Sequence, residues 1–208
     1  MKTKMLTAFL ALMWLASPAF SQYEDHLDFT EPIHKNESAF TISLTSNGLA
    51  LGGVFRKALP DYLHLGITAE FMILRDDKEF QQITYFGQLI SVNDANRLFM
   101  VPINLELKKR LFANSIEDNF RPHIMAQGGV MLGMNFPKEQ YINGNIEKFS
   151  NEYQVGYNAV IGFGVDIITR DNFFASIRPQ YRFTYFSEEI ANKTNHSAFE
   201  IKFELGGN

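Results

Sequence analysis

The alternation of apolar and polar residues with a period of two is the feature that most limits how this chain can fold. It recurs from residue 38 to the end and is strictest in the final stretch, HSAFEIKFELGGN. There, every second residue from Phe199 to Leu205 is apolar, and the residues between them are charged. Successive side chains of a β-strand point to opposite faces, so the pattern predicts strands with one apolar and one charged face.

Eight segments of this kind follow one another along the chain. They are 38–46, 49–58, 62–74, 97–112, 120–136, 153–169, 173–186 and 196–208. Asn47-Gly48 predicts a tight hairpin between the first two, whereas polar loops at roughly 75–96, 137–152 and 187–195 follow the third, fifth and seventh. An even number of strands, with short turns at one end and longer loops at the other, is typical of a transmembrane β-barrel.

The first 21 residues have the composition of a secretory signal peptide. MKTK is positively charged, MLTAFLALMWLA is an apolar run of about 12 residues, and small residues stand at Ala19 and Ser21. This run is shorter than the roughly 20 residues that a membrane-spanning helix needs. We therefore expect a signal peptide at 1–21 that is cleaved after Ser21, a flexible acidic leader at 22–37, and an outer-membrane β-barrel domain at 38–208.

Composition excludes several classes of function. The formal net charge of −4 provides no basic face for a nucleic acid. The chain has no cysteine, which excludes disulfides, thiolate metal ligands and a cysteine nucleophile. The sequence also has no P-loop, dinucleotide-binding glycine pattern or zinc-ligand spacing. It therefore predicts no cofactor and no nucleic-acid partner.

Two closed barrels fit the alternation, and each is the other turned inside out. In a soluble, lipocalin-like barrel the apolar face lines a ligand cavity, whereas in an outer-membrane barrel it meets lipid and the charged face fills the lumen. Balanced charge on the polar face, aromatic residues near strand ends and the export signal favour the second. We predict an all-β fold, an eight-stranded antiparallel up-and-down transmembrane β-barrel located in the cell outer membrane.

The polar faces carry acidic and basic residues in nearly equal number, which allows them to pair inside a narrow lumen. The predicted lumen charge network consists of Arg56, Glu70, Glu106, Lys108, Arg110, Asp166, Arg178, Arg182, Glu200, Lys202 and Glu204. The predicted membrane-facing residues are Phe71, Phe99, Ile103, Leu105, Ile161, Phe163, Phe183, Phe199 and Phe203. Long charged side chains in an eight-stranded barrel predict a plugged lumen rather than an open pore.

Three prolines stand inside or near the start of predicted strands, where proline removes a ladder hydrogen bond. Pro122 suits a strand start, whereas Pro102 and Pro179 lie within strands. We expect β-bulges at Pro102 and Pro179, with the ladder broken at both positions.

The chain resembles the small eight-stranded outer-membrane β-barrel proteins of the OmpA-like and PorT-like kind, common in Gram-negative bacteria. The likeness rests on MVPINLELKKRLF, NFRPHIMAQGGVMLG, AVIGFGVDI and SIRPQYRFTYF and covers about residues 38–205. It implies this fold but no specific function. The last strand is also similar to the signal read by the barrel-assembly machinery, except that Leu205 replaces a final aromatic residue and Gly206-Gly207-Asn208 follow.

His196, Ser197 and Glu200 come nearest to a catalytic constellation. A hydrolase needs a nucleophile, a base and an orienting acid within hydrogen-bond reach. On a strand His196 and Glu200 share one face, while Ser197 points to the other. The sequence therefore predicts no catalytic residues.

Candidate metal ligands are sparse and poorly spaced. His64 and His123 both face the predicted lumen, where hydrogen-bonded interior histidines are favoured over a metal pair. Asp76, Asp77 and Glu79 stand in the first long loop without the spacing of a calcium loop, which favours a solvated acidic loop. The sequence predicts no metal site.

The sequence favours a non-enzymatic outer-membrane protein with a structural or interaction role carried by its extracellular loops. The expected partners are outer-membrane lipid, the barrel-assembly machinery and a loop-binding or surface protein. Two alternatives stay open: a soluble lipocalin-like barrel that binds a hydrophobic ligand, and a lipid A-modifying membrane enzyme.

Overall fold

The computed structural model describes residues 35–75, 80–83, 89–92, 98–113, 115–116, 119–137, 140–142, 145–147, 150–169 and 173–207. The predicted signal peptide, residues 22–34 of the predicted leader and the acidic residues Asp76, Asp77 and Glu79 lie outside these ranges. Within them every regular element is a β-strand. No helix of the described residues is long and apolar enough to span a membrane.

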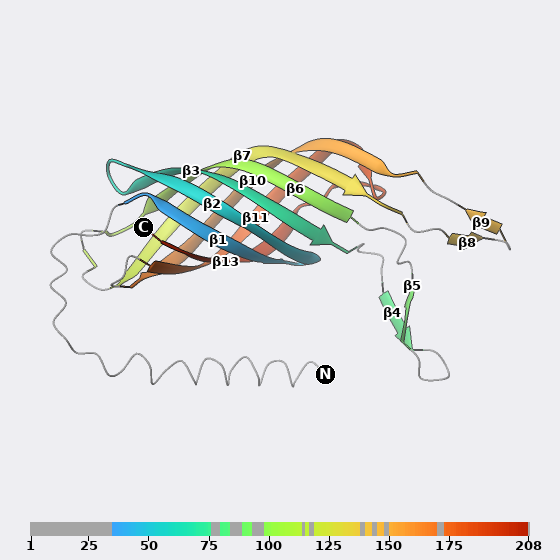
Figure 1. Cartoon of the computed structure of the whole chain (residues 1–208), viewed down its shortest axis with the longest axis horizontal. Helices are drawn as coiled ribbons and strands as arrows, with labels where there is room; N and C mark the ends of the chain where they lie inside the picture. The colour runs from blue at the N-terminus through green and yellow to red at the C-terminus, as the bar shows by residue number, and fades with distance from the viewer. Residues whose placement is uncertain are drawn as a thin grey trace. The chain divides into compact units, whose positions relative to one another are not determined.

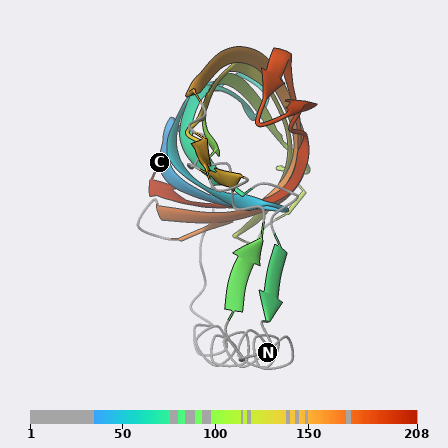
Figure 2. The ribbon, with the colours of Figure 1, turned by 90° about the vertical axis from the view of Figure 1, so that its right-hand side faces the viewer.

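Eight strands form one closed antiparallel barrel (Figures 1 and 2). They are β1 (Glu37–Thr45), β2 (Gly48–Leu59), β3 (Leu63–Leu74), β6 (Leu98–Arg110), β7 (Phe120–Asn135), β10 (Glu152–Ile168), β11 (Phe173–Ile190) and β13 (Ala198–Gly207). Each pairs with its neighbours along the chain, and the pairing of β1 with β13 joins the two ends of the sheet. Closure joins the two edges of the eight-stranded sheet to each other, and the predicted up-and-down barrel is confirmed.

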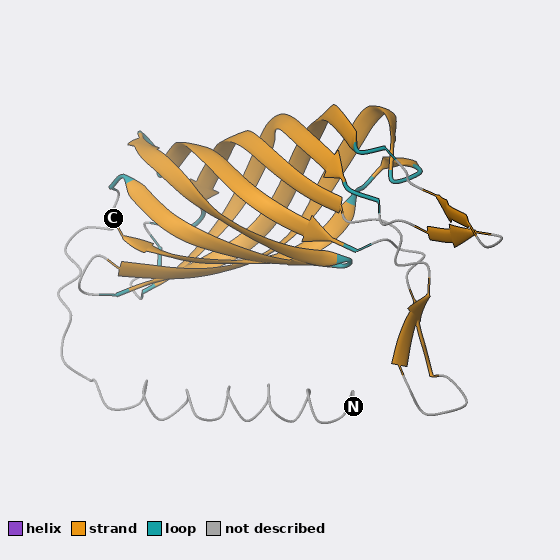
Figure 3. Cartoon of the chain, turned by 45° about the vertical axis from the view of Figure 1, so that its right-hand side comes forward, coloured by secondary structure: helices purple, strands orange, loops and turns teal. Residues whose placement is uncertain are grey.

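Five short strands lie between the barrel strands, in segments that the sequence analysis assigned to loops. They are β4 (Phe80–Ile83), β5 (Leu89–Val92), β8 (Gln140–Ile142), β9 (Asn145–Glu147) and β12 (Lys193–Asn195). β4 pairs with β5 and β8 pairs with β9 as separate hairpins, whereas β12 pairs with the extended end of β11. The strands of the barrel itself cross its wall obliquely (Figure 3), as closure of a small barrel requires.

The barrel has two different ends. We call the end where β2 joins β3, β6 joins β7 and β10 joins β11 the turn end, and the opposite end the loop end. At the turn end, β2 and β3 are joined through Asp61 and Tyr62, which both have positive φ, as a tight hairpin turn requires. At the loop end, β1 and β2 are joined by Ser46 and Asn47, one residue earlier than the predicted Asn47-Gly48.

The prolines interrupt the ladder without forming bulges. Between β3 and β6 the pairing stops after Ala69 with Ile103 and resumes, in the same register, at Met72 with Met100, so that Pro102 falls in the gap. Between β10 and β11 a gap of the same kind contains Pro179. The predicted break in the ladder is therefore confirmed, but the predicted bulges are wrong. Each proline lacks an N–H toward one neighbouring strand only, and the strand on its other side remains paired.

Candidate functional site

Charged side chains from all eight strands point into the interior of the barrel. The buried acidic residues are Glu37, Glu70, Glu106, Asp166, Glu200 and Glu204, and the buried basic residues are Arg56, Lys108, Arg110, Arg121, Arg178, Arg182 and Lys202. All eleven residues assigned to the lumen charge network are among them. They lie on the inward-facing rows of strands whose alternate residues are exposed, so strand periodicity alone directs them inward.

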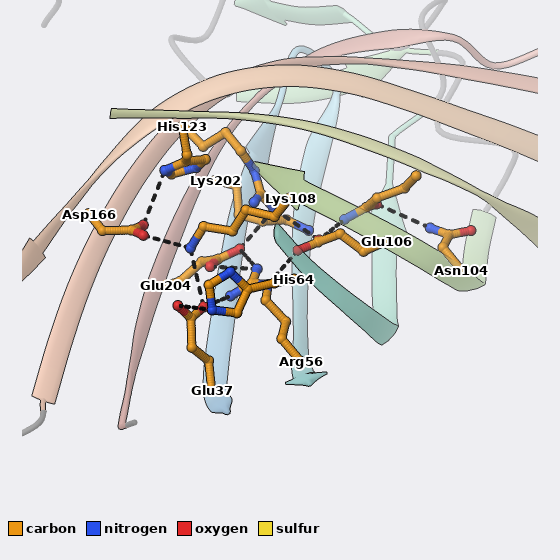
Figure 4. Close-up of polar contacts among 12 residues, drawn as sticks. Glu37, Arg56, His64, Asn104, Glu106, Lys108, His123, Asp166, Lys202 and Glu204 are labelled. Carbon is orange, nitrogen blue, oxygen red and sulfur yellow. Dashed lines mark hydrogen bonds and ion pairs between the residues drawn. The ribbon is translucent and has the colours of Figure 1, made fainter. Parts of the chain in front are cut away.

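Arg56 of β2 is the centre of the network (Figure 4). Its guanidinium lies 3.1 Å from the Glu37 carboxylate and 2.8 Å from the Glu204 carboxylate, and its Nε donates to Glu106. A second arginine, Arg178 of β11, lies 2.8 Å from the other Glu204 oxygen and 3.6 Å from Glu106. Two guanidinium groups thus pair with three carboxylates, and all five side chains are fully buried. Burial of charge requires such pairing.

Glu37 connects this centre to the turn end. Its carboxylate accepts from Lys108 Nζ at 3.2 Å and from Arg110 at 2.6 Å. Asp166 of β10 receives the same two cations, at 2.7 Å from Lys108 and 3.2 Å from Arg110. The sequence analysis placed Glu37 in the leader, but in the structure it is the first residue of β1 and is fully buried. The first strand therefore begins one residue earlier than predicted, and that residue carries a central carboxylate of the network.

The two interior histidines extend the turn-end part of the network. His64 Nε2 lies 3.5 Å from Glu37 and 3.2 Å from the backbone oxygen of Lys35. His123 Nδ1 lies 3.2 Å from Asp166. In the part of the chain that the structure describes, no group of three His, Asp or Glu residues is arranged to hold a metal ion. Each histidine therefore borders one carboxylate of the network.

A smaller charged group lies nearer the loop end and joins β3, β11 and β13. Arg182 bridges Glu70 and Glu200, at 2.7 Å from each carboxylate. Lys202 donates to the other Glu70 oxygen, and Gln180 donates to Glu200. These ion pairs join strands that are far apart in sequence. They hold opposite walls of the barrel together and also neutralise buried charge.

Apolar side chains close the interior beyond the charged network at the loop end. The buried apolar cluster there consists of Ala50, Met72, Leu74, Leu98, Met100, Met131, Phe186, Ile190 and Ala191. At the turn end the fully buried Phe174 ring lies under Lys108 Nζ, 5.4 Å from its centroid. The apolar layer is not predicted from the sequence above, although Met72 and Leu74 continue the inward-facing row of Glu70 and so could have been assigned to it.

A hairpin formed by β11 and β12 supplies part of this apolar layer. β11 continues to Ile190 and turns through Ala191 and Asn192, both with positive φ. Glu152 at the start of β10 holds the turn, because its Oε2 accepts from the Ala191 N–H at 2.9 Å and from Asn135 Nδ2 at 3.0 Å. The hairpin is thus fixed to the loop-end termini of β7 and β10.

His196, Ser197 and Glu200 do not form a catalytic group. His196 Nε2 lies 3.1 Å from the Ile190 carbonyl oxygen, and Ser197 Oγ donates to Asn195 Oδ1 at 2.6 Å. Glu200 is buried in the lumen with Arg182. The three side chains therefore have separate partners and no shared proton-transfer geometry.

The outer face of the barrel is apolar. The nine residues assigned to the membrane-facing set lie on the outward-facing rows, seven of them exposed and Phe99 and Phe203 half-buried. Near the loop end the rings of Phe71, Phe99, Phe136 and Tyr153 follow one another around the wall, with centroids 5.7, 5.8 and 5.9 Å apart. Phe112, Phe120 and Phe173 are exposed near the turn end. An apolar wall with aromatic rings toward both ends is the surface that a membrane barrel presents.

The chain is similar to several solved structures. The N-terminal β-barrel domain of Pseudomonas aeruginosa OprF has a TM-score of 0.51 at 15% identity, covering 85% of this chain and 98% of that chain. A major outer membrane protein of Thermus thermophilus has a TM-score of 0.43 at 12% identity, with 83% and 98% covered. Neisserial surface protein A has a TM-score of 0.39 at 11% identity, with 82% and 91% covered.

The sequence itself gives no assignment. No family model matches it, and no curated protein matches it. The relation of this chain to known proteins therefore rests on its fold, a closed eight-stranded antiparallel barrel that is similar to the OprF barrel domain. Its fold is that of the small eight-stranded outer-membrane β-barrels.

Proposed function

We propose that this protein is exported through a cleaved signal peptide and resides in the outer membrane as a non-enzymatic barrel. Its role is structural or one of interaction through the loops at roughly 75–96 and 137–152. The observation that carries the proposal is the inverted distribution of side chains, with charge inside and apolar side chains such as Leu105 and Phe163 outside. Exposed apolar surface on this scale is stable in lipid and is an aggregation hazard in water.

The same distribution argues against the soluble alternative. A lipocalin-like barrel needs an apolar cavity and a charged outer surface. Here the inward-facing rows carry paired carboxylates and guanidinium groups, and the apolar residues inside are packed against one another at the loop end. The described inward-facing rows thus carry the charge that a lipocalin-like barrel would place on its outer surface.

The terminal strand supports assembly by the barrel-assembly machinery. Phe199, Ile201 and Leu205 are exposed on the outer face of β13, while Glu200, Lys202 and Glu204 of the same strand are buried in the lumen. β13 therefore has the two-faced character expected of a strand that is recognised before it closes a barrel. We place the short turns of the barrel on the periplasmic side of the membrane and the longer loops at the cell exterior, as in other outer-membrane barrels.

The lumen network predicts that the barrel does not conduct ions steadily. Paired Arg, Lys and Glu side chains are buried in the interior and an apolar cluster lies at the loop end, so we expect no continuous column of water through the barrel. Recordings from planar bilayers containing the refolded protein should show no steady, large single-channel conductance. A large-pore porin in the same bilayers is the positive control, and a steady large conductance from this protein would contradict the plugged lumen.

A further inference from the structure

An apolar groove crosses the outer wall of the barrel. It has a volume of about 590 Å³, within the range of ligand sites, roughly 300–1,000 Å³. Its lining includes small side chains, Ala126 of β7 and Pro179 of β11, and larger rings, among them Phe163 and Tyr181. The Tyr181 ring packs edge-on against Phe183 with centroids 4.7 Å apart. The groove also passes over the interruption in the β10–β11 ladder at Pro179.

The groove extends from one end of the barrel toward the other. It begins at Lys109, the penultimate residue of β6 at the turn end, and reaches Phe199 of β13, which pairs with Tyr181 near the middle of β11. Between them it crosses β7, β10 and β11. Four strand spacings of about 4.8 Å each make it roughly 19 Å long, slightly more than the hydrocarbon of one leaflet, about 15 Å.

Charge is confined to the turn end of the groove. Lys109 is the single charged residue among those that line it. The side chain is half-buried and lies on the outer face, and its Nζ donates to the backbone oxygen of Asp61. An ammonium group has three donors, so others remain for a ligand. A cation at the membrane interface beside an apolar groove is complementary to an anionic lipid headgroup with its acyl chain.

We propose that this groove binds an anionic glycerophospholipid of the periplasm-facing leaflet, with one acyl chain along the groove and the phosphate beside Lys109. The proposal rests on the membrane location and orientation proposed above. The oblique path over Ala126 and Pro179 lets an acyl chain lie against the wall, and Lys109 selects the charge of the headgroup. A zwitterionic lipid gains the apolar contact but less of the electrostatic attraction.

The test measures how the folded barrel in phosphatidylcholine vesicles associates with lipids spin-labelled near the end of the acyl chain. Electron spin resonance gives the immobilised fraction for labelled phosphatidylglycerol and for labelled phosphatidylcholine. The wild-type protein should favour phosphatidylglycerol by about fivefold, the effect of one lysine near an anionic headgroup. K109Q should reduce this ratio to near one, and A126F should lower the immobilised fraction of both lipids by filling the groove.

Two matched variants serve as controls. K57Q removes an exposed outer-face lysine near the turn end of β2, outside the groove, and A69F adds a ring at an exposed outer position of β3. Both should behave as the wild-type protein does. A preference that survives K109Q, or that K57Q removes equally, would overturn the proposal, as would association of barrels into dimers that excludes both lipids. Failure of the protein to insert into the vesicles would instead contradict the membrane location itself.

Discussion

R56M is expected to lower the free energy of unfolding by about 3–5 kcal/mol, the cost of leaving buried charges without their partner. Arg56 contacts the carboxylates of Glu37, Glu106 and Glu204, and all four side chains are fully buried. Methionine fills much of the volume but leaves three carboxylates facing one another. The change is measured by unfolding the protein in lipid vesicles with urea and monitoring its β-structure by circular dichroism.

The neighbouring residue provides the control for this prediction. Lys57 also carries a positive charge, but it lies on the outer face of β2 and is exposed, so K57M should change stability by less than about 0.5 kcal/mol. Adding E106Q to R56M removes one of the three carboxylate charges that lose Arg56 and should recover part of the loss. Equal effects of R56M and K57M would show that the interior ion pairs do not stabilise the barrel.

G129A is expected to destabilise the barrel by about 1–3 kcal/mol through overpacking. Gly129 lies on an inward-facing row, and a Cβ atom there would stand 2.1 Å from the Ile103 carbonyl oxygen and 2.7 Å from the Asn104 Cα. These are backbone atoms of β6, which pairs with β7 at this point, so β6 cannot yield without loss of hydrogen bonds. The same urea titration measures the effect.

The adjacent glycine tests whether the effect is steric. Gly128 lies on the outer face, and a Cβ atom there would meet no atom within 4 Å. G128A should therefore leave stability unchanged or raise it slightly, because alanine restricts the unfolded chain more than glycine does. If G128A destabilised the protein as much as G129A, close contact between β6 and β7 would not explain the need for glycine.

Alternation in the sequence was enough to predict the eight strands of the barrel. Period-two patterns are strong where one face is apolar throughout, and β3 is an example, because every residue from His64 to Leu74 alternates between buried and exposed. Export and residence in the outer membrane remain predictions. The positions of Pro102 and Pro179 also predicted the breaks in the ladder, because a missing N–H can be read from the sequence. They did not predict that the strands keep the same register on both sides of each break, because register depends on the neighbouring strand.

The sequence could not predict which charges meet. Arg56 and Glu204 are 148 residues apart, and their contact depends on the stagger of all eight strands, which alternation does not specify. The position of Glu37 inside the barrel was missed for a related reason. Its surroundings in sequence are polar and acidic, and burial follows only from the pairing of Glu37 with Arg56 across β1 and β2.

The apolar layer at the loop end was not predicted because the composition of the local sequence there is ambiguous. Ile190 falls in the segment 187–195, which is predicted as a polar loop, and Phe186 is the last residue of the predicted strand before it. In the structure the space beside Gly133 and Gly156 is occupied by the Phe186 ring, since a Cβ atom at either glycine would stand within 3.0 Å of it. Complementarity between a ring and two glycines on other strands is a tertiary property that no short segment reveals.

The central claim is that this chain forms a closed barrel in a membrane, with its charges inside and its apolar face outside. It is tested most directly by expressing the full chain, isolating membranes and comparing its mobility on SDS gels with and without boiling. The account predicts that the protein is in the membrane fraction and that its mobility shifts on heating, because a closed barrel resists SDS until it is unfolded by heat. A soluble protein with the same mobility before and after boiling would contradict it.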